Sequence, residues 1–175
     1  MSVTIILSDV HGDETSLNAV LLKAEKADAS GILFAGDLGL ASPGIMMLLK
    51  YRNIPFVCVR GNCDSPWDYQ DASLPIAPLY RLMTACGRSV FITHGDRYCC
   101  PEDVGLPAEK GMIVITGHTH VPDLSFHDDI YWLNPGSISR PRGRSKASYA
   151  ILDDRSIRIL GLEDDSCIAS IELNP

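Results

Sequence analysis

Short runs of apolar residues that end in polar residues recur through the first half of the chain. Three such runs occupy residues 4–7, 32–35 and 56–59. Each is long enough for a strand covered on both faces, and each is followed by a turn signal that combines glycine with aspartate or asparagine. Between the runs, apolar residues recur at three- and four-residue intervals, which is typical of a helix with one buried face. The pattern predicts strands and helices in the order βαβαβ.

The two expected helices carry recognisable signals at their ends. Asp13 can cap a first helix that stops near Ser30-Gly31. Ser42-Pro43 supplies an N-cap and a first-turn proline for a second helix. Residues 65–78 contain three prolines and no helical period, so we expect a loop there. The buried face of the first helix should consist of Leu17, Val20, Leu21 and Ala24.

The second half of the chain is expected to be mostly β. Residues 80–85 and 89–93 flank Cys86-Gly87, which predicts a hairpin. Two prolines interrupt residues 97–110, so we expect a loop with at most one short helix. Further strands are expected at 112–116, 124–126, 130–133, 149–152, 157–160 and, on a weaker pattern, 168–171. The length of the chain favours a single α/β domain over residues 1–175.

Composition narrows the classes of protein that the chain can belong to. Apolar residues make up 46% and charged residues 21%, which is ordinary for a globular domain. The net charge of −7 argues against a long nucleic acid as partner, but it allows a small phosphorylated substrate whose charge a metal offsets. No apolar run approaches the roughly 20 residues of a membrane helix, and a signal-peptide pattern is absent, so we expect no membrane association. The six cysteines show no CxxC spacing, which favours reduced thiols and a cytoplasmic location.

Polar side chains that can bind a metal follow the ends of the apolar runs. The carboxyl ends of strands form the ligand crevice of open α/β sheets, so these side chains should meet there. Oxygen and imidazole ligands without thiolate suit Mn, Fe or Zn. Seven ligands are too many for one ion, whereas two ions roughly 3.5–4 Å apart would share a carboxylate. A polar turn or a purely structural role is the alternative for each motif taken alone. The seven residues are Asp9, His11, Asp37, Asn62, His94, His118 and His120.

The segments that hold these residues resemble, in this order, the motifs of the calcineurin-like metallophosphoesterases. They are Asp9-Val10-His11-Gly12, Gly36-Asp37, Gly61-Asn62-Cys63-Asp64, Thr93-His94-Gly95-Asp96 and Gly117-His118-Thr119-His120. The resemblance runs from residue 3 to about 152. Within it, Asn134-Pro135-Gly136-Ser137 is similar to a segment of the small single-domain phosphodiesterase branch. The resemblance implies a four-layer αββα sandwich of two mixed β-sheets with helices outside.

The resemblance also implies roles for individual residues. One metal would be bound by Asp9, His11 and His120, the other by Asn62, His94 and His118, and Asp37 would bridge them. A hydroxide held between the two ions would hydrolyse a phosphoester. Manganese is the expected metal, while Fe, Ni, Co and Zn share these ligand preferences. The family further suggests a homodimer or homotetramer.

The residue after Asn62 departs from the pattern of many family members, which have histidine there to assist the leaving group. This chain has Cys63, a weaker acid with a reference pKa of about 8.5. With Cys63 beside Asp37, Asn62 and His94 at the reaction centre, we expect activated aryl diesters to react faster than alkyl monoesters.

The remaining polar residues near the motifs leave alternatives open. Asn62, Arg140 and Arg142 are candidate substrate ligands, although the basic run that contains the two arginines could equally be a solvated loop. We expect Asp64 and Asp96 to support ligands or cap turns, and His127 to be solvated. Two alternatives to a dinuclear enzyme are a non-catalytic scaffold that resembles a eukaryotic retromer subunit, and a mononuclear or structural metal site.

Overall fold

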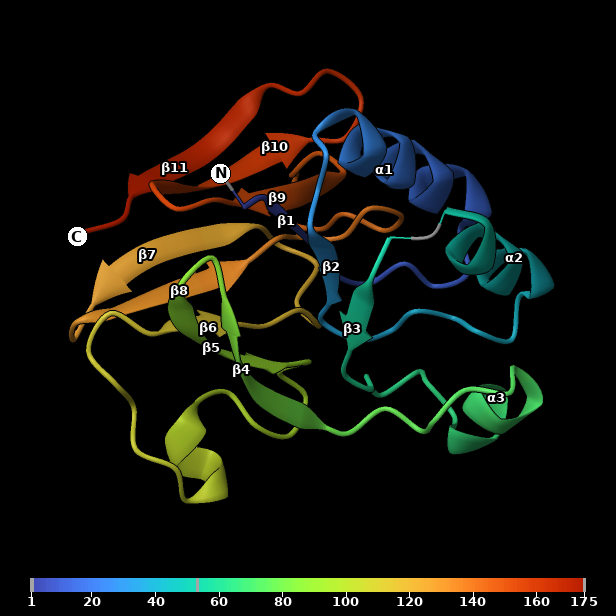
Figure 1. The fold of residues 1–175 in the computed structure, drawn as a ribbon, viewed down its shortest axis with the longest axis horizontal. Helices are drawn as coiled ribbons and strands as arrows, with labels where there is room; N and C mark the ends of the chain where they lie inside the picture. The colour runs from blue at the N-terminus through green and yellow to red at the C-terminus, as the bar shows by residue number, and fades with distance from the viewer. Residues whose placement is uncertain (1, 53, 175) are drawn as a thin grey trace.

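The computed structural model describes residues 2–52 and 54–174, and these form two β-sheets packed face to face (Figure 1). One sheet has the strand order β11-β10-β9-β1-β2-β3 and the other β4-β5-β6-β8-β7. The strands are β1 (Thr4–Leu7), β2 (Gly31–Phe34), β3 (Phe56–Cys58), β4 (Tyr80–Ala85), β5 (Arg88–Thr93), β6 (Ile113–Ile115), β7 (Asp123–His127), β8 (Ile130–Asn134), β9 (Ser148–Leu152), β10 (Ser156–Gly161) and β11 (Cys167–Glu172). The helices are α1 (Glu14–Lys26), α2 (Pro43–Arg52), α3 (Pro66–Asp71) and the 3-10 helix η1 (Pro101–Val104).

The expected βαβαβ start of the chain is confirmed. Strand β1 lies between β2, to which it is parallel, and β9, to which it is antiparallel. The Asp13 carboxylate caps α1 by accepting the Ser16 N–H at 3.1 Å, and the predicted apolar face of α1 is buried. The helix ends at Lys26, earlier than expected, and Asp28 just beyond it has a left-handed φ of 50° that no helix accommodates.

The second half is mostly β, as expected, with strand ends within one or two residues of the prediction. Cys86 and Gly87 form a two-residue hairpin turn with φ of 47° and 75°. Two positive φ values are the signature of a type I′ turn, whose twist matches that of the strands. The loop over residues 97–110 contains one short helix, η1, and it packs against the outer face of the second sheet.

The expectation of a loop over residues 65–78 was wrong, because α3 begins this segment. The Ser65 hydroxyl accepts the Trp67 N–H, Asp68 accepts the Ser65 N–H in return, and Pro66 occupies the first turn. This is a capping box, which stabilises a helix start irrespective of apolar periodicity. A helix of six residues is too short to show a repeating pattern of apolar residues, and α3 buries only Tyr69.

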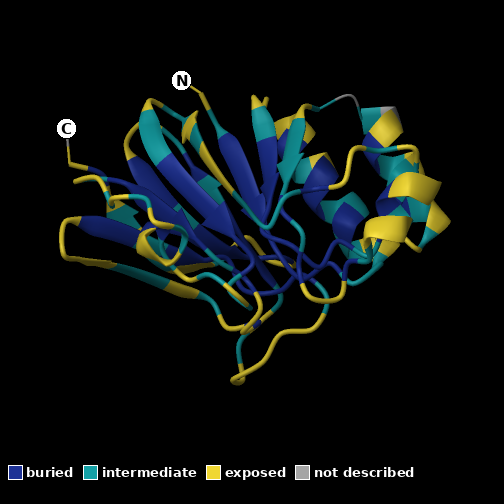
Figure 2. Cartoon of the chain, turned by 90° about the horizontal axis from the view of Figure 1, so that it is seen from below, coloured by how far each residue is buried: buried dark blue, intermediate teal, exposed yellow. Residues whose placement is uncertain are grey.

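The two sheets share a core between their inner faces, seen as the dark blue strands of Figure 2. Ile6, Ile92, Ile113 and Ile159 in this layer are fully buried. Helices α1 and α2 cover the outer face of the first sheet (Figure 1). The α/β sandwich expected from the sequence is therefore confirmed. No described helix is both long and apolar enough to cross a membrane.

Candidate metal centre

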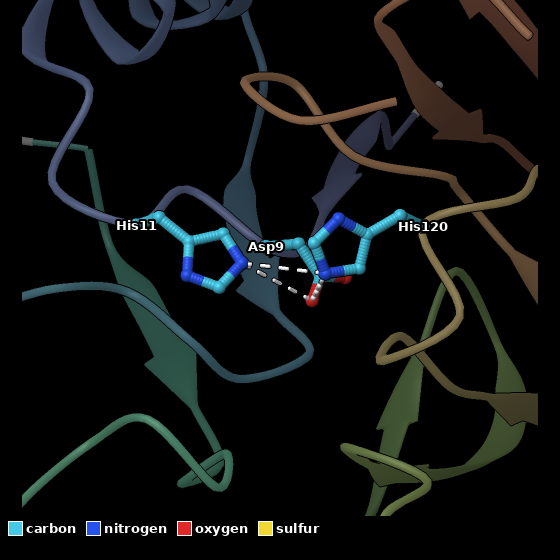
Figure 3. A group of neighbouring side chains, drawn as sticks. All are labelled: Asp9, His11 and His120. Carbon is cyan, nitrogen blue, oxygen red and sulfur yellow. Dashed lines mark hydrogen bonds and ion pairs between the residues drawn. The ribbon is translucent and has the colours of Figure 1, made fainter. Parts of the chain in front are cut away.

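Three predicted ligands form a tight group beyond the end of β1 (Figure 3). Asp9 and His11 follow β1 directly, and His120 comes from the turn after β6. Asp9 Oδ1 lies 3.1 Å from His120 Nε2 and 3.8 Å from His11 Nε2, while the two imidazole nitrogens are 3.3 Å apart. Three donor atoms therefore face one small volume.

A second group forms around Asn62, beyond the end of β3. Asn62 Oδ1 lies 3.1 Å from His94 Nε2 and 2.9 Å from His118 Nδ1. Asp37 lies between this group and the first, because its Oδ2 is 3.5 Å from His94 Nε2 and 3.8 Å from His11 Nε2. All seven predicted residues are thus brought together at the carboxyl ends of strands from both sheets.

Backbone donors fix the orientation of the two buried carboxylates. The His118 N–H donates to Asp9 Oδ2 at 3.1 Å, and the Cys63 N–H donates to Asp37 Oδ1 at 2.8 Å. In each carboxylate the other oxygen is left facing the imidazoles. Asp9 and Asp37 are 0% and 2% exposed, so water cannot solvate them freely.

Two imidazoles are oriented in the same manner. His94 Nδ1 and His120 Nδ1 each lie 2.7 Å from a backbone carbonyl, of Ala35 and Arg140 respectively. A carbonyl oxygen only accepts, so each Nδ1 carries a hydrogen, and this arrangement fixes which nitrogen of a metal-ligating histidine is free. In His120, the Nε2 lone pair then faces Asp9 Oδ1, which is buried and has no hydrogen-bond partner among the described residues. Two facing lone pairs are an arrangement that a cation satisfies, so the residues fit a metal.

The turns that carry the ligands have unusual backbone conformations. The φ angles are 55° for Asp9, 48° for His11, 54° for Asp37, 67° for His118 and 62° for His120. Positive φ is uncommon outside glycine, and residues held there cluster at functional sites. The strands end at the site, and the left-handed backbone conformation of these five residues directs their side chains toward it.

Asp64 supports the Asp37 turn, as expected for a partner of the ligands. Its carboxylate accepts the N–H groups of Asp37 at 2.8 Å, Gly61 at 2.9 Å and Gly39 at 3.2 Å. A side chain at Gly61 would collide with the Asp37 carboxylate, so the close approach of these two loops requires glycine.

A further support comes from the segment that follows β8. The hydroxyls of Ser137 and Ser139 donate to the Asp9 carbonyl at 2.8 and 2.9 Å. Asn134 donates to the Gly117 carbonyl at 2.7 Å and thereby holds the turn that carries His118. Residue reasoning alone did not assign these roles; the only signal was the similarity of the Asn-Pro-Gly-Ser segment to the phosphodiesterase branch.

The electrostatics of the centre follow from burial and proximity. Burial disfavours a charged His94, but the contacts with Asp37 and the Ala35 carbonyl outweigh it and raise the pKa of His94 to about 9. For Asp37, burial opposes the charge, and His94 and the Cys63 N–H hold its pKa well below the usual range. Burial lowers the pKa of His11. Burial and the neighbouring Asp37 raise the pKa of Cys63 to about 11.

The other predicted residues lie at different distances from the centre. Cys63 Sγ is within 4.8 Å of ligand atoms of His11 and Asp37. The exposed Arg140 is close enough for its charge to act on both His11 and Cys63: after burial, it adds to the lowering of the His11 pKa, and it opposes part of the rise in the Cys63 pKa. Arg142 is also exposed, and its N–H donates to the His120 carbonyl at 3.1 Å.

Two further polar residues lie outside the ligand groups: His127 was expected to be solvated, whereas Asp96 was expected to support a ligand or cap a turn. The exposed His127 stacks on Trp132 at 5.2 Å between ring centroids and contacts Asp128 rather than any of the seven residues. Asp96 pairs with Arg97 at 3.6 Å.

A two-sheet sandwich with buried carboxylates and imidazoles converging at its strand ends defines a class of metal-binding α/β proteins. The sequence model of the calcineurin-like phosphoesterase superfamily domain matches residues 1–156, and the chain belongs to this metal-dependent family.

Relatives and solved structures agree with this assignment. Phosphodiesterase YfcE of Escherichia coli (strain K12) is 30% identical over the full length of both chains. A solved structure of YfcE, described as a phosphoesterase from E. coli, superimposes with a TM-score of 0.87 over 98% of this chain and 100% of its own. The zinc complex of Vps29 from Entamoeba histolytica has a TM-score of 0.67 at 17% identity, over 98% of this chain and 99% of its own, and shows likeness of fold alone.

Proposed function

We propose that the chain is a phosphodiesterase that acts with two divalent metal ions. Asp9, His11 and His120 bind one ion, and Asn62, His94 and His118 bind the other. Asp37 bridges the two ions, and manganese is the expected metal. The activity class is supported by the family and by the name of the E. coli relative.

The observation that carries the dinuclear proposal is the position of Asp37. One of its oxygens is held by the Cys63 N–H, and the other lies between His11 and His94, which belong to different groups. A single carboxylate between two sets of oxygen and nitrogen donors is what a pair of ions requires. Asp9 Oδ1, which has no hydrogen-bond partner among the described residues, is a second buried oxygen that a cation could bind.

When bound, the ions would lower the pKa of a water nucleophile from about 15.7 to about 7 and offset the charge of the substrate phosphate. The chain's own residues then position the substrate. Arg140 adds positive charge beside the centre, and we assign it and Arg142 to the non-bridging phosphate oxygens. Asn62 can contact both an ion and the phosphate.

The class of substrate depends on how readily its leaving group departs without a proton from the protein. Cys63 stands where many family members have a histidine that assists the leaving group, and a thiol is a weaker acid than an imidazolium, so Cys63 is a poor proton donor to an alkoxide that must leave at neutral pH. A phenolate leaves without that help. We therefore expect small aryl phosphodiesters to react much faster than alkyl monoesters, and equal rates would contradict this assignment. Assembly as a homodimer or homotetramer and a cytoplasmic location stay predictions from the sequence.

The test is hydrolysis of bis(p-nitrophenyl) phosphate by chelator-stripped protein, with and without Mn²⁺, Fe²⁺, Ni²⁺, Co²⁺ or Zn²⁺. Activity should appear with metal, and Asp37→Asn should abolish it, whereas Asp128→Asn, an exposed carboxylate outside the centre, should not. Metal analysis should give two ions per chain for the active protein and fewer for Asp37→Asn. Folded protein that is inactive with every metal would refute the enzyme, and full activity with one ion would refute the bridge.

A scaffold of the same fold is the weaker alternative. The likeness to Vps29 concerns fold, at low identity. A scaffold has no need for two buried carboxylates whose free oxygens face imidazoles, because burying such charges without partners is costly.

A further inference from the structure

A cavity of about 520 Å³ lies on the outer face of the first sheet, beside the last turn of α1. Figure 1 shows α1 next to β9 and β10. Residues of these two strands form the floor of the cavity. We call it the α1–β10 cavity. Its walls include Lys23, Lys26, Tyr149, Ile151, Arg158 and Leu160. None of these residues belongs to the metal centre, which lies beyond the other end of α1.

The α1–β10 cavity concentrates positive charge in a chain whose net charge is −7. Lys23, Lys26 and Arg158 line it, against a single lining carboxylate, Asp165. Asp165 pairs with Lys23 at 2.6 Å. The lining carries three positive charges and one negative charge, and Asp153 outside the lining pairs with Arg158, so Lys26 is the one lining cation without an ion pair among the described residues.

Arg158 has unused hydrogen-bonding capacity at this place. Its Nη2 lies 3.3 Å from Asp153. Its Nε is buried and has no hydrogen-bond partner within residues 2–52 and 54–174. The Arg158 side chain is 42% exposed, so the Nη groups of its guanidinium are open to an anion. Guanidinium groups present a planar fork that matches phosphate oxygens, and the neighbouring lysines can contribute point charges.

Apolar side chains of β9 and β10 form the rest of the floor of the α1–β10 cavity. Tyr149 and Leu160 are 2% and 8% exposed, and Ile151 is half-buried. Tyr149 is held in place, because its hydroxyl donates to Asp165 at 2.9 Å and Lys23 lies over its ring. The site is an open groove whose lining combines a few charged groups with apolar side chains, so a ligand there would keep part of its surface in water.

We propose that the α1–β10 cavity is a second binding site, which takes a small organic phosphomonoester. The phosphate lies among Lys26, Lys23 and Arg158, and the organic group lies against Tyr149, Ile151 and Leu160. A phosphomonoester carries a charge of roughly −1.5 to −2 at pH 7 and three acceptor oxygens, so it can contact the two lysines and the guanidinium together, which the two oxygens of a carboxylate cannot. The site goes beyond the proposed hydrolysis and does not depend on it.

The test is a titration of the full chain with phenylphosphonate, whose carbon–phosphorus bond resists hydrolysis, followed by amide shifts in ¹H–¹⁵N spectra. Saturable shifts are expected at Lys26, Ile151 and Arg158. Lys26→Gln and Arg158→Gln should each weaken the affinity read at these amides by about tenfold or more, as for loss of one charged hydrogen bond. Arg158→Lys, which keeps the charge and loses the fork, should fall in between.

Controls separate this site from the metal centre and from general charge. Lys110→Gln, at an exposed lysine outside the cavity, and Asp37→Asn should leave the affinity at the cavity amides unchanged. Inorganic phosphate should bind more weakly, because it has no organic group for the apolar side chains of the floor. The proposal is overturned by unsaturable shifts, by equal losses in Lys110→Gln and Arg158→Gln, or by equal affinity for inorganic phosphate. The amide spectra themselves report whether each variant is folded.

Discussion

Metal binding to the metal-free protein should release a proton from His94. Both ring nitrogens face acceptors: Nδ1 lies 2.7 Å from the Ala35 carbonyl, and Nε2 lies 3.1 Å from Asn62 Oδ1 and 3.5 Å from Asp37 Oδ2. Despite burial, these contacts raise the pKa of His94 to about 9. The proton on Nε2 occupies the position that a metal would take, so the metal must displace it.

The size of the effect follows from the pKa. At pH 7 a group with a pKa of about 9 is protonated in nearly every molecule, so displacing its proton weakens apparent metal affinity roughly 100-fold relative to high pH. Affinity should therefore rise about tenfold per pH unit from pH 7 to pH 9. His11 adds nothing in this range, because burial lowers its pKa. The same proton stabilises the metal-free fold fully below the unfolded pKa of about 6.5, and that stability is lost as the pH rises through about 9.

The assay is calorimetric titration of Mn²⁺ at pH 7 in two buffers of different ionisation enthalpy, which counts the protons released. Chelator competition between about pH 7 and pH 9 then gives the slope of affinity against pH. The His94→Asn variant should lose most of the slope, and His127→Asn, at an exposed histidine outside the centre, should keep it. Affinity that does not change with pH, together with no proton release, would refute the assignment of a protonated His94.

Three further outcomes are expected. Asp64→Asn should lower metal affinity or activity roughly 10- to 100-fold, because it replaces one acceptor oxygen by an NH2 donor that faces backbone N–H groups; Asp71→Asn on α3 should not, and equal losses in the two variants would contradict the role of Asp64. The rate of Cys63 alkylation in metal-free protein should rise about tenfold per pH unit toward the Cys63 pKa of about 11. Mass spectrometry measures this rate with Cys167 as the reference thiol, and a rate that levels off near neutral pH would disprove the raised pKa. Ser65→Ala should cost about 1 kcal/mol in urea unfolding, and a cost no larger than that of Ser170→Ala would rule out a stabilising cap.

The strands and the meeting of the ligands were predictable because they rest on local patterns. Apolar runs of three or four residues mark β1, β2 and β3, and parallel strands bring their carboxyl ends to one edge whatever their order. Asp9, Asp37 and Asn62 follow those ends, so their proximity needed no knowledge of the turns. Sequence reasoning could not say that β9 to β11 complete the first sheet, since pairing between β1 and β9 depends on contacts far apart in the chain.

Helix α3 shows why the remaining local structure was missed. Hydrophobic periodicity detects helices that bury a face over several turns, whereas α3 has six residues and buries Tyr69 alone. Its signal was in its cap, since Ser65, Pro66 and Asp68 form the pattern of a capping box. A search for caps in the proline-containing segment would have found it.

The backbone of the ligand turns is the part of the site that residue types do not reveal. Five of the seven ligands have positive φ, and holding a non-glycine residue there costs roughly 1 to 3 kcal/mol. Summed over the turns, this approaches the whole net stability of a domain, roughly 5 to 15 kcal/mol. Such turns persist only where rigid surroundings offset their cost. Here the core between two sheets, the Asp64 carboxylate and the hydroxyls of Ser137 and Ser139 supply that support. The ligands can therefore be positioned before a metal binds. The strained turns lie where the two sheets end together, because the packed core there is rigid enough to hold them.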